Sequence, residues 1–245
     1  MDIYNLIVTY SDNFIPVFIR ISVMLMFIPF IGARMTPIVV RIGVALALTL
    51  LLLPVVKVNS ENLLLSVFEA FFVGLSMGLT VRVVLSAIEM AAQWINLQLG
   101  LGMASIFNPL VGEALGPLTF FYTLLGMVVF FMLDMHHYFI EGIIRSFDIT
   151  SVRYSSIFQG IMEYSKIMFP LAFKITAPVL LVQMIINIAM GFVSKVMPQA
   201  NIFFVAVPLN IFSGLFFIIL SIPIMLAVIA RYLINIREAL QVITR

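Results

Sequence analysis

The sequence predicts an all-α integral membrane protein whose long, partly broken helices form hairpins and do not all span the membrane in the conventional way. Hydrophobic residues make up 63% of the 245 residues and charged residues only 10%, whereas roughly a quarter of a soluble domain is charged. Several apolar runs are as long as membrane-spanning helices, and short segments rich in Gly, Pro and polar residues separate them. A backbone that crosses lipid must satisfy its own hydrogen bonds, which favours helices over open sheets.

Composition also excludes several classes of protein. The formal net charge is only +2 and the basic residues are scattered, which argues against nucleic-acid binding. The chain has no cysteine, so it forms no disulfide. The N-terminal stretch lacks a basic region and a small-residue cleavage site, so we expect no cleaved signal peptide. We expect one integral domain over residues 1–245, with no attached soluble enzyme module.

The first two apolar runs cover residues 14–31 and 38–56. Pro16 and Arg20 interrupt the first run, and Arg41 lies near the start of the second. Gly and Pro residues punctuate the short connection between the runs, which predicts a tight turn.

The third run begins near Leu63 and meets no helix breaker other than isolated glycines before Gly100. It predicts one helix of about 35 residues, or ~50 Å, which exceeds the ~30 Å hydrocarbon core of a bilayer. Polar residues recur at steps of four and three along its second half and share one helical face. We call these residues the polar stripe: Arg82, Ser86, Glu89, Gln93 and Asn96. We expect them to face a partner helix, a water-filled path or an environment outside the bilayer, or to form a subunit contact.

A fourth run covers residues 118–140, and a mixed, charged segment follows it at residues 143–166. The last third of the chain predicts a long helical hairpin with arms at residues 167–193 and 202–233. A polar turn separates the two arms. Two prolines fall inside the second arm, where they are expected to bend it.

The longest interruption of the apolar pattern covers residues 91–117. Its four glycines and Pro109 cannot sit comfortably in a single helix, so the backbone must break here. Irregular backbone beside membrane helices survives only where protein buries it or where it borders water. We therefore predict a pore plug, with a plain connector as the alternative, in a segment that includes Gly100, Gly102, Ser105, Phe107, Asn108, Pro109, Gly112, Glu113 and Gly116.

The motif GLSMG at residues 74–78 matches a nucleophile elbow by letter. That elbow needs a strand before its serine, whereas Ser76 lies in a helical run. The helical context favours a close-packing face formed by Gly74 and Gly78. An intramembrane protease that pairs Ser76 with His136 or His137 is a distant alternative, because no set of oxyanion donors is evident.

Asp134, His137 and Glu141 stand at i, i+3 and i+7, so they can share one helical face. This spacing suits a metal site or a proton relay. However, a single helix would supply every ligand. We therefore interpret the three residues as a polar knot at a helix end or a subunit contact, and we predict no metal site and no cofactor.

Charged residues inside the apolar runs cost a few kcal/mol each in lipid on insertion scales. We expect them to pair with one another or to be buried against other subunits. They line a substrate or ion path, or they hold an assembly together. The residues concerned are Arg20, Arg41, Arg82, Glu89, Asp134 and Lys174.

The final hairpin carries the most specific pattern in the chain. Asn187 and Gly191 form an N-x-x-x-G motif, and the tip that follows contains Lys195, Pro198, Gln199, Asn201 and Phe203. With Pro208 and Gly214, this pattern resembles the FliR family of flagellar export-gate proteins, which is related to the SctT component of virulence type III secretion systems. The resemblance extends to the residues around Arg20 and Arg41, to the segment after Gln98 and to the stretch that begins at Asp134.

The resemblance implies an export-gate subunit in the bacterial inner membrane, at the flagellar basal body. It implies one copy of this chain, joined to FliP and FliQ homologues in a channel for unfolded exported proteins, with FlhB and FlhA homologues as further partners. Residues 1–160 would be FliP-like, residues 161–245 a FliQ-like hairpin, and residues 100–116 the plug of the closed pore. We expect no enzyme activity. The energy for export would come from elsewhere in the apparatus, since no phosphate-binding GxxxxGK[ST] loop is present. An injectisome subunit of the SctT type and a small-molecule transporter are the alternatives.

Overall fold

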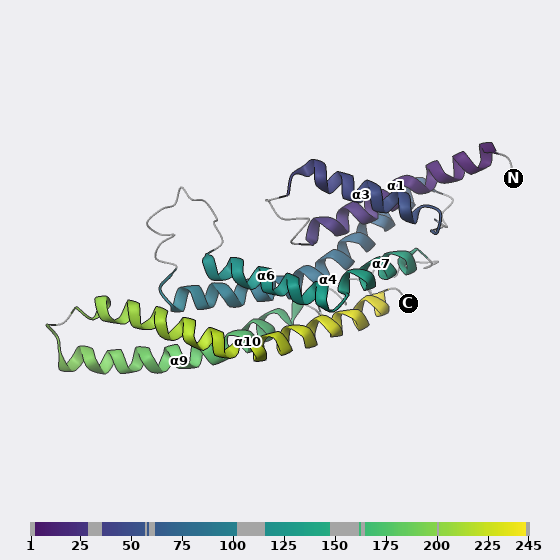
Figure 1. The fold of residues 1–245 in the computed structure, drawn as a ribbon. Coiled ribbons are helices and arrows are strands. Elements are labelled where there is room, and N and C mark those ends of the chain that lie inside the picture. The colour runs from purple at the N-terminus through teal and green to yellow at the C-terminus, as the bar shows by residue number, and fades with distance from the viewer. Residues whose placement is uncertain are drawn as a thin grey trace. The chain divides into compact units, whose positions relative to one another are not determined.

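The structure is a computed structural model that describes residues 3–28, 36–56, 58, 62–101, 116–147, 162, 165–199 and 201–243. Within these ranges every extended regular element is an α-helix (Figure 1), which confirms the predicted all-α class. The helices are α1 (Ile3–Phe27), α3 (Ile38–Leu52), α4 (Leu63–Gln98), α6 (Pro117–Met132), α7 (Met135–Ser146), α9 (Met168–Val196) and α10 (Ile202–Ile243).

Three helices are long and apolar enough to cross a membrane. They are α4, α9 and the Phe204–Asn235 part of α10. The helices α6 and α7 pass the same test together, although they are bent by 66° at a short break, so the described chain holds three or four candidate spans. The protein is therefore embedded in the membrane.

Helix α4 confirms the prediction of one uninterrupted helix between Leu63 and the glycine-rich break. It contains 36 residues, or ~54 Å at 1.5 Å per residue. Buried apolar side chains recur along it at steps of three and four, which is the spacing of a single helical face. They are Ala70, Val73, Met77, Val81, Val84, Ile88, Ala91, Ile95 and Leu99, the last of which directly follows the helix.

The structure adds two details that the apolar runs did not specify. The fourth run is not one helix, because the chain breaks between α6 and α7, where Asp134 has a φ of 52°. No Gly or Pro marks this break in the sequence. Pro16, which interrupts the apolar pattern of the first run, lies inside α1, and the helix continues past it.

The chain divides into two compact units. Unit 1 consists of Met1–Val84, Phe130–Ile167 and Leu233–Arg245, and unit 2 of Leu85–Val129 and Met168–Tyr232. In unit 1, α1 packs on α3 and the first part of α4 supplies buried side chains. The two units share α4, α6 and α10, each of which contributes residues to both.

In unit 2, α9 and α10 lie side by side and antiparallel (Figure 1), as predicted for the final hairpin. The Nε2 atom of Gln183 on α9 donates a hydrogen bond of 2.9 Å to the carbonyl oxygen of Asn210 on α10. Further along, the Nζ atom of Lys174 donates to the hydroxyl of Tyr232 at 2.8 Å. These pairs fix the register of the two arms.

Candidate functional site

Most of the predicted plug lies outside the described residues, namely Gly102, Ser105, Phe107, Asn108, Pro109, Gly112 and Glu113. The two flanks are described. Gly100 and Leu101 follow the end of α4, and Gly116 precedes α6. Both flanks belong to unit 2, so the structure shows how the segment 102–115 is attached.

Helix α4 ends at a glycine in the left-handed conformation. Gly100 has a φ of +76°, which a residue with a Cβ atom rarely adopts. The amide of Leu99 still donates to the carbonyl of Ile95 at 2.9 Å, and that of Gly100 donates to Leu97 at 3.1 Å. Gly100 therefore stops the helix and turns the chain into the segment 102–115, as the sequence predicted for this break.

The two flanks are held together by one amide side chain. Asn96 is buried, and its Nδ2 atom donates a hydrogen bond of 2.9 Å to the Oγ1 atom of Thr119 on α6. A Cβ atom at Gly116 would lie 2.7 Å from the same Nδ2 atom, so a side chain at this position would displace the Asn96 amide. The end of α4 and the start of α6, which flank the segment 102–115, are thus joined within unit 2.

The residue that follows α4 is inserted into the hairpin. Leu99 is fully buried, and its side chain occupies the space in which Gly214 of α10 would carry a Cβ atom. The same Cβ atom would lie 2.9 Å from the Nε2 atom of Gln183. We call Asn96, Leu99, Gly116, Thr119 and Gly214 the loop base.

A polar ladder lies beside the loop base, between the arms of the hairpin. Gln183 is fully buried, and its Nε2 atom donates to the Asn210 carbonyl and to the Ser213 hydroxyl at 3.2 Å. The Nδ2 atom of Asn210 donates to the Oδ1 atom of Asn187 at 3.2 Å. Because these bonds pair the amide nitrogens of Gln183 and Asn210 inside an apolar hairpin, they favour one register of its arms.

The polar stripe occupies a different face of α4 from the apolar core. Each of its members directly follows a buried residue, so the stripe lies about 100° around the helix from the buried face. Arg82, Ser86 and Glu89 are half-buried, and Gln93 is exposed. Only Asn96, which belongs to the loop base, is buried.

Arg20 is buried in unit 1 and contacts α7. Its Nη1 atom donates hydrogen bonds of 2.7 and 2.9 Å to the carbonyl and hydroxyl oxygens of Ser146. Its guanidinium lies 3.7 Å from the centre of the Phe147 ring, which adds a cation–π contact. The half-buried carboxylate of Glu69 attracts the same charge. Arg20 therefore joins α1 to the end of α7.

The other charges that we expected to be buried are more accessible. Arg41 is half-buried on the first turn of α3. Lys174 is exposed, and its Nζ atom contacts Tyr232 both at the hydroxyl and above the ring, 5.3 Å from the ring centre. Asp134 is also exposed. Within this chain, Arg20 is the most deeply buried of the four.

The tip of the hairpin is exposed. This holds for Lys195, Pro198, Gln199 and Asn201, whereas the side chain of Phe203 lies outside the described part of the chain. The tip residues are thus displayed at the end of α9 and in the turn that leads to α10.

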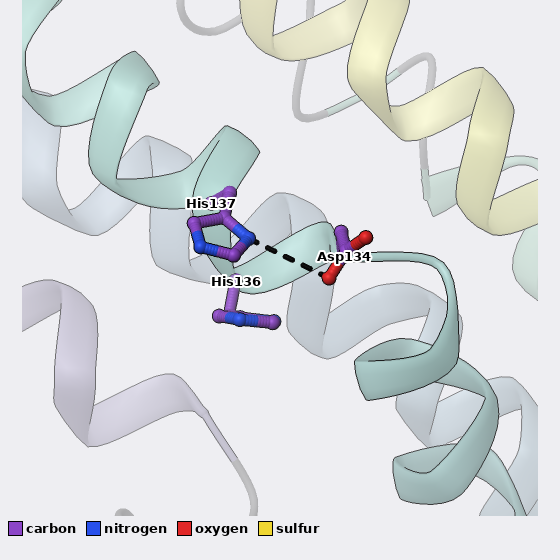
Figure 2. Close-up of side chains that lie close together, drawn as sticks. All are labelled: Asp134, His136 and His137. Carbon is purple, nitrogen blue, oxygen red and sulfur yellow. Dashed lines mark ion pairs between the residues drawn. The ribbon is translucent and has the colours of Figure 1, made fainter.

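The α6–α7 break brings Asp134 and both histidines together (Figure 2). An oxygen of Asp134 lies 3.5 Å from the Nδ1 atom of His137. Glu141 does not join them and instead pairs with Arg145 one turn further along α7 at 2.5 Å. The face expected from the i, i+3, i+7 spacing is therefore only partly formed, because the spacing did not anticipate the break at Asp134.

The GLSMG motif forms the close-packing face that its helical context predicts. A Cβ atom at Gly74 would lie 2.5 Å from the Arg20 carbonyl oxygen, and one at Gly78 would lie 2.8 Å from the Phe27 ring. Ser76 is fully buried and donates to the Val73 carbonyl of its own helix at 2.8 Å. A hydrogen bond from the hydroxyl to the backbone of its own helix is ordinary for a serine packed inside a helical protein.

Sequence reasoning did not single out Leu99 or Thr119. Both look like ordinary apolar or small residues in their runs, and only their partners across unit 2 give them a role. Gly214 gave a partial signal, since an isolated glycine in an apolar helix marks a close approach of another group.

Comparison with known proteins agrees with this architecture. Residues 12–236 match the family described as "Bacterial export proteins, family 1". The chain is 32% identical to the flagellar biosynthetic protein FliR of Bacillus subtilis, over 92% of each chain. It is 31% identical to the FliR protein of Aquifex aeolicus over 84% of each chain, and 30% identical to that of Caulobacter vibrioides over 84% of this chain and 86% of the relative. The chain therefore belongs to the FliR family of bacterial export proteins.

Proposed function

We propose that this chain is the gate subunit of a flagellar protein-export channel and that residues 100–116 close its pore at rest. The loop base is the observation that carries this proposal. Asn96 and Thr119 tie the two flanks of the segment together, and Leu99 is inserted against Gly214. A segment held at both ends on a rigid support can move as one piece without disturbing the helices.

The glycines at the flanks supply the freedom that such a movement needs. Gly100 already has a backbone conformation that other residues rarely adopt. A gate needs torsional freedom at a few positions beside a firm attachment. The glycine turn at Gly100 and the buried amide of Asn96 provide these two features at the same place.

The surface of the hairpin supports an assembly within the membrane. Many large apolar side chains of unit 2 are exposed, and a folded protein in water would bury them. Those on α9 and α10 include Phe173, Leu181, Met184, Ile185, Phe192, Phe204 and Phe212. We propose that lipid and FliP and FliQ homologues cover them in the inner membrane at the basal body, with this chain present once. We further propose a FliP-like role for residues 1–160 and a FliQ-like role for residues 161–245.

Exported unfolded proteins would then pass the polar stripe and the hairpin tip, and FlhA and FlhB homologues would bind nearby. Supporting this proposal, the stripe lies on the face of α4 next to its buried one, and Gln93 is exposed. Polar side chains beside a path allow water and an extended peptide to remain solvated.

Deleting residues 105–112 from the chain in the assembled complex tests the plug. We expect higher ion conductance in reconstituted vesicles and impaired discrimination of exported substrates. An equally long Gly/Ser replacement is the matched control, because it preserves the connection between the flanks but not the side chains. Unchanged conductance of an assembled deletion variant would contradict the plug.

Purification of the untagged complex from membranes tests the assembly. We expect this chain to co-purify with two smaller membrane proteins that are present in several copies each, and native mass spectrometry would give the stoichiometry. Recovery of this chain only as a monodisperse monomer, from membranes that also contain these two proteins, would contradict the proposed role.

A further inference from the structure

The α6–α7 break gathers three side chains that can bind a metal ion. Potential ligand atoms of Asp134, His136 and His137 lie within 4.8 Å of one another. Figure 2 shows the imidazole of His137 pointing toward the Asp134 carboxylate, with His136 beside it. The two imidazole centres are 4.2 Å apart.

Two features of the cluster are unusual for an ordinary helix start. Asp134 occupies the N-cap position of α7, but its side chain forms no capping hydrogen bond and its backbone is left-handed, with a φ of 52°. An N-cap Asp normally accepts a hydrogen bond from the first turn. In addition, the Nδ1 atom of His136 is buried and has no hydrogen-bond partner among the described residues.

We propose that Asp134, His136 and His137 form a binding site for a divalent transition-metal ion such as Zn²⁺. Two imidazole nitrogens and one carboxylate oxygen are a ligand set that zinc accepts, with water in the open position. Hard cations such as Mg²⁺ prefer oxygen ligands alone. The ligand atoms of a tetrahedral zinc site lie ~3.3 Å apart, whereas those of the cluster lie within 4.8 Å of one another. Rotation of the exposed Asp134 and His137 side chains would bring the three ligand atoms together.

The composition of the chain makes this cluster the dominant site for such an ion. The whole sequence contains two histidines and no cysteine, and both histidines lie in the cluster. Thiolate and imidazole are the ligands that select zinc over magnesium. Outside the cluster, therefore, the chain has no histidine or cysteine side chain that could bind such an ion.

Binding would fix the geometry of the α6–α7 break. Asp134 lies in the turn after α6, whereas His136 and His137 lie in the first turn of α7. An ion held by all three connects the turn to the helix in place of the missing capping bond. The positive end of α7 disfavours a cation, so the carboxylate of Asp134 is a necessary part of the site.

Calorimetric titration of Zn²⁺ into the full-length chain, purified in detergent through a tag without histidine, tests the proposal. We expect one Zn²⁺ per chain, and an excess of Mg²⁺ should not displace it. Asp134→Asn should lower the affinity about 10-fold or more, and the double variant His136→Gln/His137→Gln should abolish binding. Glu141→Gln is the matched control, because Glu141 is a nearby exposed acid that pairs with Arg145. The Zn²⁺ affinity of this variant should equal that of the wild type.

A second measurement uses the unaltered protein and so does not depend on variants that fold. With ¹⁵N-labelled histidine, both imidazoles should shift in the NMR spectrum up to one equivalent of Zn²⁺ and then stop. Co²⁺ bound in place of Zn²⁺ should show the absorption of a site with nitrogen ligands. Unshifted histidine signals, binding that needs millimolar Zn²⁺, or an equal loss of affinity in Glu141→Gln and Asp134→Asn would overturn the proposal.

Discussion

The side chain of Leu99 fills the space in which residue 214 would carry a Cβ atom. Leu99 follows α4 and Gly214 lies within α10, so the contact attaches the end of α4 to the C-terminal hairpin within unit 2. It also lies where the chain enters the segment 102–115.

Gly214→Ala should destabilise the chain by about 1–3 kcal/mol, the usual cost of overpacking. Its methyl group would displace Leu99 and crowd the Gln183 amide. Thermal unfolding of the detergent-purified protein measures the effect. Gly43→Ala is the control, because a Cβ atom there meets nothing within 4 Å. Adding Leu99→Ala should cost less in the Gly214→Ala background than alone, and strict additivity would contradict direct contact.

Asn96→Ala and Thr119→Val should each loosen the attachment of the segment 102–115. Each removes the 2.9 Å hydrogen bond between the two side chains, which is worth about 1 kcal/mol. We expect each variant to raise the ion conductance of the assembled complex, with little further change in the double variant. Thr123→Val serves as the control, since among the described residues the Thr123 hydroxyl donates only to a carbonyl of its own helix. If the variants conduct ions only as well as the wild type, the loop base does not affect gating.

Arg20→Lys should lower the stability of the chain by about 1.5–3 kcal/mol. Lysine cannot place a planar group over Phe147 while it donates two hydrogen bonds to Ser146. Arg145→Lys on α7 is the control, because that arginine is exposed and pairs with Glu141 at the surface, where such pairs contribute little. Apparent melting temperatures in detergent compare the two variants. Equal shifts in melting temperature would show that the buried contacts of Arg20 contribute no more to stability than the surface pair of Arg145.

Ser76→Ala should leave assembly and export near the wild-type level. The Ser76 hydroxyl bonds only to its own helix in the described structure, so its loss changes no contact between helices. Ser76→Leu should impair assembly, since the site is fully buried and has no room for a larger side chain. Export activity in cells measures both effects. A complete loss of function in Ser76→Ala would instead support a chemical role for the Ser76 hydroxyl.

Local sequence patterns predicted which segments form helices, but they did not predict the boundary between α6 and α7. The run from Leu63 to the glycine-rich break is apolar and free of proline, and it forms one helix as predicted. The break at Asp134 was missed because no Gly or Pro marks it. An aspartate tolerates the left-handed conformation better than most residues, but whether it adopts that conformation depends on what surrounds it.

Apolar composition, the spacing of small residues and the glycine-rich interruption were enough to predict a helical membrane protein with a close-packing face at Gly74 and Gly78. These features depend on residues near one another in the chain, and a helix converts such spacing directly into a face. The partners of Arg20, Leu99 and Asn96 needed the tertiary structure. Ser146 is 126 residues from Arg20 in the sequence, and helical periodicity predicts which side of a helix is buried without predicting which residue it meets.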